Sequence, residues 1–191
     1  MNLWIFELIN GWAGRNAGLD AIMVFAATNL LYLVGAVVAV LAARALYHRR
    51  WKPVLQTGSA LALACALNFV VGGLNHEARP FQDHQVVQLI PHEPSVSLPS
   101  DHATAAFALA LAAIVFLHRW WGAGLLVASA AIGFSRVWVG VHYPGDVLAS
   151  LGIALFAVAA VLLVDRLRAR RQSASAQLPS ADVADSVSES R

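Results

Sequence analysis

Five apolar blocks, each long enough or nearly long enough to cross a bilayer, are the feature that most constrains this chain. Their apolar residues are nearly continuous rather than spaced at amphipathic intervals, which is typical of helices that cross a membrane. The composition agrees, with 59% hydrophobic residues and a mean hydropathy of +0.63. The expected spans are residues 21–43, 53–73, 102–117, 121–137 and 146–164.

The remaining segments complete the predicted fold. Residues 3–12 combine apolar Trp4 and Ile5 with polar Glu7, which predicts an interfacial helix. Only residues 118–120 join the third and fourth spans, so these two should form a tight antiparallel hairpin. The predicted class is all-α: a polytopic membrane helical bundle with five spanning helices and a short N-terminal interfacial helix.

Charge and composition at the helix ends predict orientation and domains. Basic residues follow the first, third and fifth spans, so these ends should be cytoplasmic, while Arg15, Arg79 and Arg136 lie on the outer side. This distribution explains the basic pI without a nucleic-acid partner. Residues 1–171 are predicted to form the membrane domain, and residues 172–191, which lack aromatics, a disordered cytoplasmic tail. The cytoplasmic set is Arg44, Arg49, Arg50, Lys52, Arg119, Arg166, Arg168, Arg170 and Arg171.

Polar clusters at the outer helix ends indicate a phosphate site. Arg79 and Arg136 carry planar cationic forks that match phosphate oxygens. Ser100 and Asp101 directly precede the third span, whose free N–H groups and positive dipole end attract anions. The simpler interpretation of Ser100 or Asp101 is a helix N-cap, and that of the charged groups is interfacial or structural pairing. The three clusters are residues 75–80, 99–102 and 135–146.

Two histidines and an aspartate add reactive groups. His102 lies in the first turn of the third span, where the helix dipole disfavours protonation and a bound anion favours it, so it can exchange a proton near neutral pH. His142 and Asp146 lie four residues apart at the entrance to the fifth span. The carboxylate can therefore hold one imidazole nitrogen and direct the other at a substrate. This spacing indicates an activated histidine nucleophile.

Two of the clusters contain complete motifs. Pro99, Ser100 and His102 form Pro-Ser-x-His, and residues 135–146 form Ser-Arg-x5-His-x3-Asp. In this order, with one helical hairpin between them, the motifs resemble the signature of the type 2 phosphatidic acid phosphatase superfamily. Within it, the phrases FELINGWAGRN, ARPF and PSDHAT are similar to bacterial undecaprenyl-diphosphatases of the bacitracin-resistance type. The resemblance covers about residues 3–168.

The remaining family motif, Lys-x6-Arg-Pro, is present only in part. Arg79 and Pro80 match it, but Gly72 occupies the lysine position. One phosphate-binding cation of the family pattern is therefore missing. Asn75 and His76 are candidate replacement donors, and the alternative is that both are ordinary interfacial residues.

The resemblance implies a six-helix phosphatase fold, no metal or other cofactor, and a role for each motif residue. His142 attacks phosphorus while Asp146 orients it, and His102 acts as acid and then base. Arg79, Ser100 and Arg136 hold the phosphate oxygens. The implied substrate is a polyprenyl diphosphate lipid, undecaprenyl diphosphate, hydrolysed on the outer face of the bacterial inner membrane. Its hydrolysis recycles the cell-wall carrier lipid and confers bacitracin resistance.

Three alternatives remain open at this stage. One is a phosphatase of the same fold acting on phosphatidylglycerol phosphate, phosphatidic acid or lipid A, because the motifs recognise phosphate rather than the lipid tail. A second is a non-enzymatic permease component, which predicts no phosphate release. The third is a metal hydrolase that uses loop residues, although their spacing matches no compact ligand set. Those loop residues are His76, Glu77, Asp83, His84, His92 and Glu93.

Overall fold

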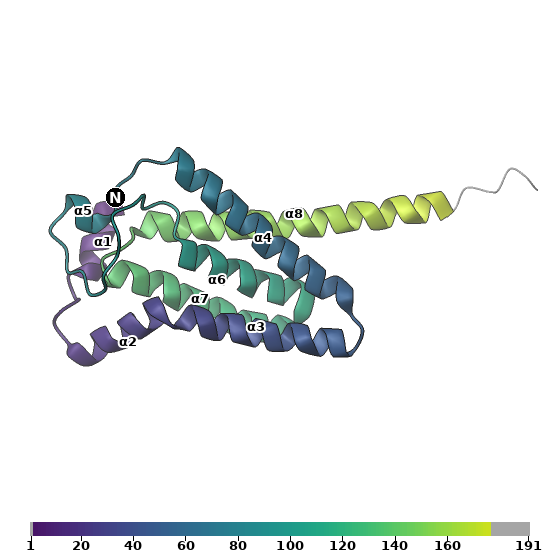
Figure 1. Ribbon diagram of the computed structural model, residues 1–191, viewed down its shortest axis with the longest axis horizontal. Coiled ribbons are helices and arrows are strands. Elements are labelled where there is room, and N and C mark those ends of the chain that lie inside the picture. The colour runs from purple at the N-terminus through teal and green to yellow at the C-terminus, as the bar shows by residue number, and fades with distance from the viewer. Residues whose placement is uncertain (1, 177–191) are drawn as a thin grey trace, which may run out of the picture.

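The computed structural model describes residues 2–176 and shows an all-helical bundle (Figure 1). The described part contains eight α-helices and one π-helical turn, η1. The elements are α1 (Asn2–Asn10), α2 (Ala17–Thr28), α3 (Leu30–Tyr47), α4 (Trp51–Leu74), α5 (Pro80–Asp83), α6 (Asp101–Ala112), η1 (Ala113–Leu117), α7 (Arg119–Trp138) and α8 (Pro144–Ala176).

Helix α6 forms the centre of the bundle, in contact with α3, α4, α7 and α8. Its sequence is rich in alanine, and Ala103, Ala106 and Ala110 are fully buried. Small side chains let neighbouring backbones approach closely, which is how membrane helices pack without a hydrophobic driving force between them. Ser100, at the start of this central helix, is therefore surrounded by the neighbouring helices at one end of the bundle.

The first expected span is wrong as a single helix. Residues 21–43 fall on two helices, α2 and α3, which are separated at Asn29. Thr28 donates its hydroxyl proton to the carbonyl of Val24 at 2.7 Å, and Asn29 donates to the Thr28 hydroxyl at 2.7 Å. Side chains that bond backbone carbonyls one turn earlier bend helices. This polar pair lies at the break between α2 and α3.

Three helices are long and apolar enough to cross a membrane among the described residues: α3, α4 and residues Pro144–Ser173 of α8. Residues Asp101–Leu117, which comprise α6 and η1, form a shorter apolar helix. Large apolar side chains such as Phe69 and Phe156 are exposed on α4 and α8, as expected of surfaces that contact lipid. The chain is thus a membrane protein with several candidate spans, and the count of five stays a prediction.

The predicted hairpin is present and tighter than expected. Between η1 and α7 only His118 is non-helical, and its Nδ1 lies 3.5 Å from the backbone nitrogen of Trp121, in the N-cap position. The predicted link, residues 118–120, is longer than the observed one because Arg119 and Trp120 already belong to α7. The imidazole supplies the acceptor that the free N–H groups of a helix start require.

The predicted site residues lie at one end of the bundle. There α1, α5 and the loop after α5 gather over the ends of α7 and α8, whereas the C-terminal half of α8 projects from the other end (Figure 1). Helix α8 extends through Ala176, so residues 172–176 of the predicted disordered tail are helical. Residues 177–191 of that tail lie outside the described residues.

Candidate active site

The turn between α7 and α8 holds a buried histidine–aspartate pair. Pro144 begins α8, where its fixed φ suits the first helical position and its missing N–H is not needed. His142 precedes this proline, and Asp146 lies in the first turn. Nδ1 of His142 is 3.2 Å from Oδ2 of Asp146, which also accepts from the backbone N–H of Tyr143 at 2.8 Å. These bonds fix the carboxylate against one edge of the imidazole.

Arg79 approaches the other edge of the imidazole from a distant part of the chain. Its Nη1 lies 2.9 Å from Nε2 of His142 and donates to the carbonyl of Val141 at 3.1 Å. A guanidinium can only donate, so Nε2 is the acceptor and the proton of the neutral ring lies on Nδ1, facing Asp146. Nε2 of His142 is therefore unprotonated and lies beside a cation that can bind the oxygens of an incoming phosphate group.

Three buried side-chain atoms have no hydrogen-bond partner in the described part of the chain: Oγ of Ser100, Nε of Arg136 and Oδ1 of Asp146. All three belong to residues predicted for the site. Buried polar groups are normally paired, so a cluster of unpaired ones calls for an explanation such as ligand binding. The Ser100 hydroxyl and the Arg136 guanidinium are proton donors, which suits phosphate oxygens.

Ser100 occupies the N-cap position of α6 without capping it through its side chain. Its backbone N–H donates to the hydroxyl of Ser150 at 3.0 Å, and that hydroxyl lies 3.1 Å from the Ser100 carbonyl and 2.8 Å from the Asp146 carbonyl. Ser150 thus joins the starts of α6 and α8. The N-cap interpretation explains the position of Ser100 but leaves its hydroxyl without a role.

His102 is half-buried in the first turn of α6. It lines a cavity of about 370 Å³ with residues of α3, α4 and α6. Neighbouring Asp101 accepts a hydrogen bond from the amide of Asn68 on α4 at 2.5 Å, and the same amide accepts from Thr104 at 2.6 Å. The structure therefore places His102 on the α3–α4 side of the site.

Gly72 faces the segment that leads into α6. A Cβ atom at this position would lie 3.8 Å from Cδ of Pro99, an ordinary contact. Gly72 and Arg79 line a cavity of about 320 Å³, and neither Asn75 nor His76 is among its lining residues. Asn75 instead accepts from the backbone N–H of Glu77 at 2.7 Å, and His76 is exposed.

Two serines that the motifs did not indicate, Ser95 and Ser97, bond to the site residues. Ser95 accepts from Nε of Arg79 at 2.9 Å, and Ser97 donates to Oδ2 of Asp146 at 2.5 Å. Between them, Val96 forms an antiparallel bridge with Ala78, so this stretch is extended and alternate side chains share a face. The alternation Ser95-x-Ser97, one residue before the Pro-Ser-x-His motif, was the available signal.

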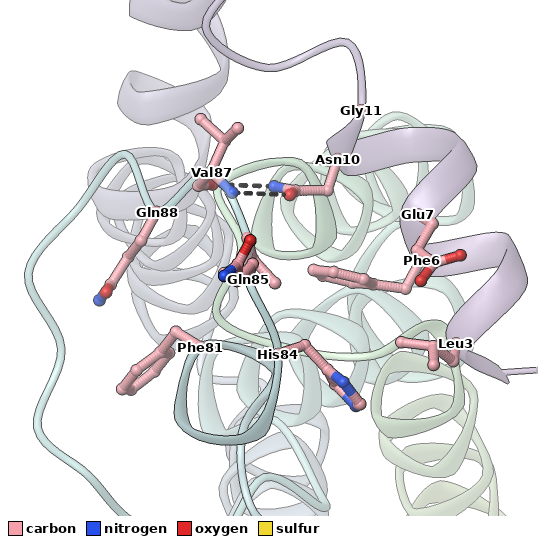
Figure 2. A pocket seen from close by; sticks show the side chains of 11 residues that line it. Leu3, Phe6, Glu7, Asn10, Gly11, Phe81, His84, Gln85, Val87 and Gln88 are labelled. Atoms are coloured by element: carbon pink, nitrogen blue, oxygen red, sulfur yellow. Dashed lines mark hydrogen bonds between the residues drawn. The ribbon is translucent and has the colours of Figure 1, made fainter.

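The loop after α5 is fastened to α1 and α7 through one asparagine. Asn10 donates to the carbonyls of Val87 at 2.9 Å and Trp138 at 2.8 Å, and accepts from the Val87 N–H at 3.0 Å. Figure 2 shows this Asn10–Val87 pair beside a pocket of about 640 Å³ between α1 and the loop. His84 lines the pocket, and its ring centroid lies 6.4 Å from that of Tyr143. The pocket borders the site without including His142.

The loop residues considered as metal ligands do not gather. Within residues 2–176, no group of three or more His, Cys, Asp or Glu side chains is arranged to hold a metal ion. His92 is the member of the set whose ring reaches the site, 6.4 Å from the ring of His142. The metal-free reaction implied by the family resemblance stays a prediction.

A membrane bundle that buries a histidine–aspartate pair among arginines and a helix N-terminus belongs to the class of membrane phosphatases. The chain belongs to the PAP2 superfamily, whose model matches residues 53–170. This confirms the family predicted from the motifs.

Individual relatives agree with that class. The chain is 40% identical over 157 residues to "Undecaprenyl-diphosphatase BcrC" of Bacillus subtilis, covering 81% of this chain and 79% of the relative. It is 32% identical over 151 residues to "Putative undecaprenyl-diphosphatase YbjG" of Escherichia coli, covering 79% and 76%. The crystal structure of Aquifex aeolicus LpxE superposes with a TM-score of 0.69 at 26% identity, covering 84% of this chain and 94% of that one.

Proposed function

We propose that this protein removes the terminal phosphate of undecaprenyl diphosphate through a phosphohistidine on His142. The observation that carries the chemistry is the fixed tautomer of His142, with Nδ1 against Asp146 and Nε2 against Arg79. The similarity to undecaprenyl-diphosphatases over four-fifths of the chain supports the choice of substrate. The lipid tail stays in the bilayer, and the head group reaches the polar end of the bundle laterally.

The first half of the reaction transfers the phosphoryl group. Nε2 of His142 attacks the terminal phosphorus, the P–O bond to the bridging oxygen breaks, and His102 protonates that oxygen as undecaprenyl phosphate leaves. Asp146 stabilises the positive charge that develops on the imidazole. Arg79, Arg136, Ser100 and the first-turn amides of α6 stabilise the charge on the equatorial oxygens. Such charge placement supplies most of the catalysis in phosphoryl transfer.

The second half of the reaction regenerates the histidine. His102, now neutral, takes a proton from a water molecule whose oxygen attacks the phosphorus of the phosphohistidine. The P–N bond breaks, inorganic phosphate leaves, and His142 recovers the lone pair on Nε2. The net reaction converts undecaprenyl diphosphate and water into undecaprenyl phosphate and phosphate, and so recycles the carrier lipid.

A substrate panel tests the assignment of the lipid. Purified protein should release phosphate faster from undecaprenyl diphosphate than from phosphatidylglycerol phosphate, phosphatidic acid or lipid A, each presented in the same detergent. Initial rates of phosphate release at several substrate concentrations give kcat/KM for each lipid. A higher kcat/KM for any of the other three lipids would reassign the substrate, and no release from any of them would favour the permease.

The pH dependence tests the state of the nucleophile. Burial, assisted by the charges of Arg79 and Arg136, lowers the pKa of His142 from 6.5 to about 4, although Asp146 opposes the shift. A lowered pKa means that the neutral, nucleophilic form persists as the pH falls. The acid limb of kcat/KM due to His142 should therefore lie near pH 4 rather than 6.5. The pKa of the substrate is measured by phosphorus NMR, and the profile of kcat/KM is corrected for this ionisation. An enzyme limb remaining near 6.5 would contradict the assignment.

We also propose that the site faces the outer side of the membrane and that the C-terminus is cytoplasmic. The basic residues at the far ends of the helices support this orientation. A reporter that is active only in the cytoplasm should be active when it is fused after Arg171. A cysteine placed in the loop after α5 should react with a membrane-impermeant reagent that is added outside the cell. If the C-terminal fusion were labelled from outside the cell, the orientation would be the opposite of the proposed one, and the site would face the cytoplasm.

A further inference from the structure

The segment between α5 and α6 is fastened at several points, and its tip lies over the active site. Val87 is bonded to Asn10, and the N–H of Leu89 donates to the carbonyl of Val139 at 3.1 Å. On the other side of the tip, the N–H of Ser97 donates to Glu77 at 2.9 Å. The tip itself is Pro-His-Glu-Pro, residues 91–94, in which two prolines restrict the backbone. Its histidine is therefore held in place.

His92, the histidine of this tip, turns toward the nucleophile. It is half-buried although its neighbours Pro91 and Glu93 are exposed. Its ring centroid lies 6.4 Å from that of His142 at an interplanar angle of 79°, and 6.4 Å from that of Phe81. Nδ1 of His92 lies 3.1 Å from the carbonyl oxygen of Glu93. A carbonyl only accepts, so Nδ1 carries a proton and Nε2 remains for a substrate.

We propose that His92 is a phosphate-binding residue of this active site, whose Nε2–H donates to an oxygen of the phosphoryl group that His142 receives. The proposal rests on the proposed phosphatase function but not on the identity of the lipid. Because the ring of His92 packs beside that of His142, a phosphoryl group bonded to His142 lies in the same cluster of side chains. The contact should therefore be made with diphosphate and monoester substrates alike.

The charges around His92 make this contact dependent on the anion. Burial lowers the pKa of His92, and the positive charges of Arg79 and Arg136 lower it further, whereas the Glu93 carbonyl and Asp101 oppose the shift. His102 and His142 are the other titratable groups that face it. In the free protein the lowered pKa favours the neutral ring, whose proton lies on Nδ1 against the Glu93 carbonyl. A bound phosphate dianion offsets the arginine charges and favours protonation, which supplies the donor.

Two substitutions separate hydrogen bonding from ring packing. His92→Phe keeps an aromatic ring against His142 and Phe81 but has no donor, whereas His92→Gln keeps a side-chain N–H donor without the ring. His84→Phe is the matched control, because this histidine of the same loop makes its ring contact with Tyr143 and lies outside the site. The probe is inorganic phosphate, titrated calorimetrically into each full-length protein in detergent, with kcat/KM measured on the preferred lipid.

His92→Phe should weaken phosphate binding and lower kcat/KM by about tenfold to a hundredfold, the range for a hydrogen bond to a charged group. His92→Gln should stay within about threefold of the parent, a fraction of that bond's value, and His84→Phe should match the parent. Parent-like phosphate affinity in His92→Phe would overturn the proposal. So would equal losses in His92→Phe and His92→Gln with a lowered unfolding temperature, since that pattern indicates a packing role. Phosphate binding is measured without turnover, so a wrong lipid assignment leaves this result intact.

Discussion

Replacing His142 with alanine should lower kcat by at least about a thousandfold, because loss of a covalent nucleophile normally costs several orders of magnitude. The side chain is buried between Asp146 and Arg79, so His142→Gln, which better preserves volume and hydrogen bonding, is measured beside it. Both variants should show the parent's helical circular dichroism. Turnover is measured as initial phosphate release, and retention of more than about a tenth of it would refute the assigned role.

The His142→Ala variant also distinguishes hydrolysis from transport in cells. Bacitracin sequesters undecaprenyl diphosphate, so an enzyme that consumes this lipid should raise resistance when overproduced. His142→Ala at equal abundance should not protect, whereas His48→Ala, at an exposed position at the far end of the bundle, should protect like the parent. If the inactive variant protects as well as the parent, sequestration or transport explains resistance better than hydrolysis does.

Asp146→Asn should lower kcat by about a thousandfold or more, comparable to loss of the orienting carboxylate in a catalytic triad. Oδ2 of Asp146 faces Nδ1 of His142, so its charge both fixes the nucleophilic tautomer and stabilises the phosphorylated ring. An amide retains most of the volume but neither the charge nor a guaranteed acceptor toward Nδ1. The measurement is single-turnover phosphoryl transfer, which isolates the step that forms the phosphohistidine.

Two controls accompany the Asp146 substitution. Asp165→Asn removes a carboxylate of the same helix whose partner is Lys52, at 2.7 Å and far from the site, and should leave turnover unchanged. Ser97→Ala removes one donor to Oδ2 but keeps the charge, so it should cost only about tenfold, the scale of one hydrogen bond to a charged group. If Asp146→Asn were no more harmful than Ser97→Ala, orientation rather than charge would be the role of the carboxylate.

Several features followed from local sequence alone. His142 and Asp146 are four residues apart across a helix start, and this separation brings imidazole and carboxylate together whatever the rest of the chain does. The short link predicted between the third and fourth spans, residues 118–120, likewise leaves little alternative to an antiparallel hairpin, and the structure shortens it to His118. In both cases the covalent connection is short, so few conformations remain and the pattern of residue types is sufficient.

Local polar chemistry was harder to interpret against an apolar background. The block 21–43 is predicted as one span because hydropathy is averaged over many residues, yet the structure divides it into α2 and α3 at Asn29. Two polar side chains, Thr28 and Asn29, change the average very little. The helix nevertheless ends at Thr28, and the next one begins at Leu30.

By itself, then, the sequence determined the helical membrane class, the family and the residues of the three motifs. Only the tertiary structure decided how the groups meet: Arg79 contacts His142 across 63 residues, Ser97 contacts Asp146 across 49, and His92 reaches the ring of His142 from the loop. These contacts depend on how α4, α6 and α8 pack around their alanine-rich interfaces and on where the anchored loop then lies. Spacing along the chain constrains atoms only within a turn or two, and beyond that distance packing sets their separation.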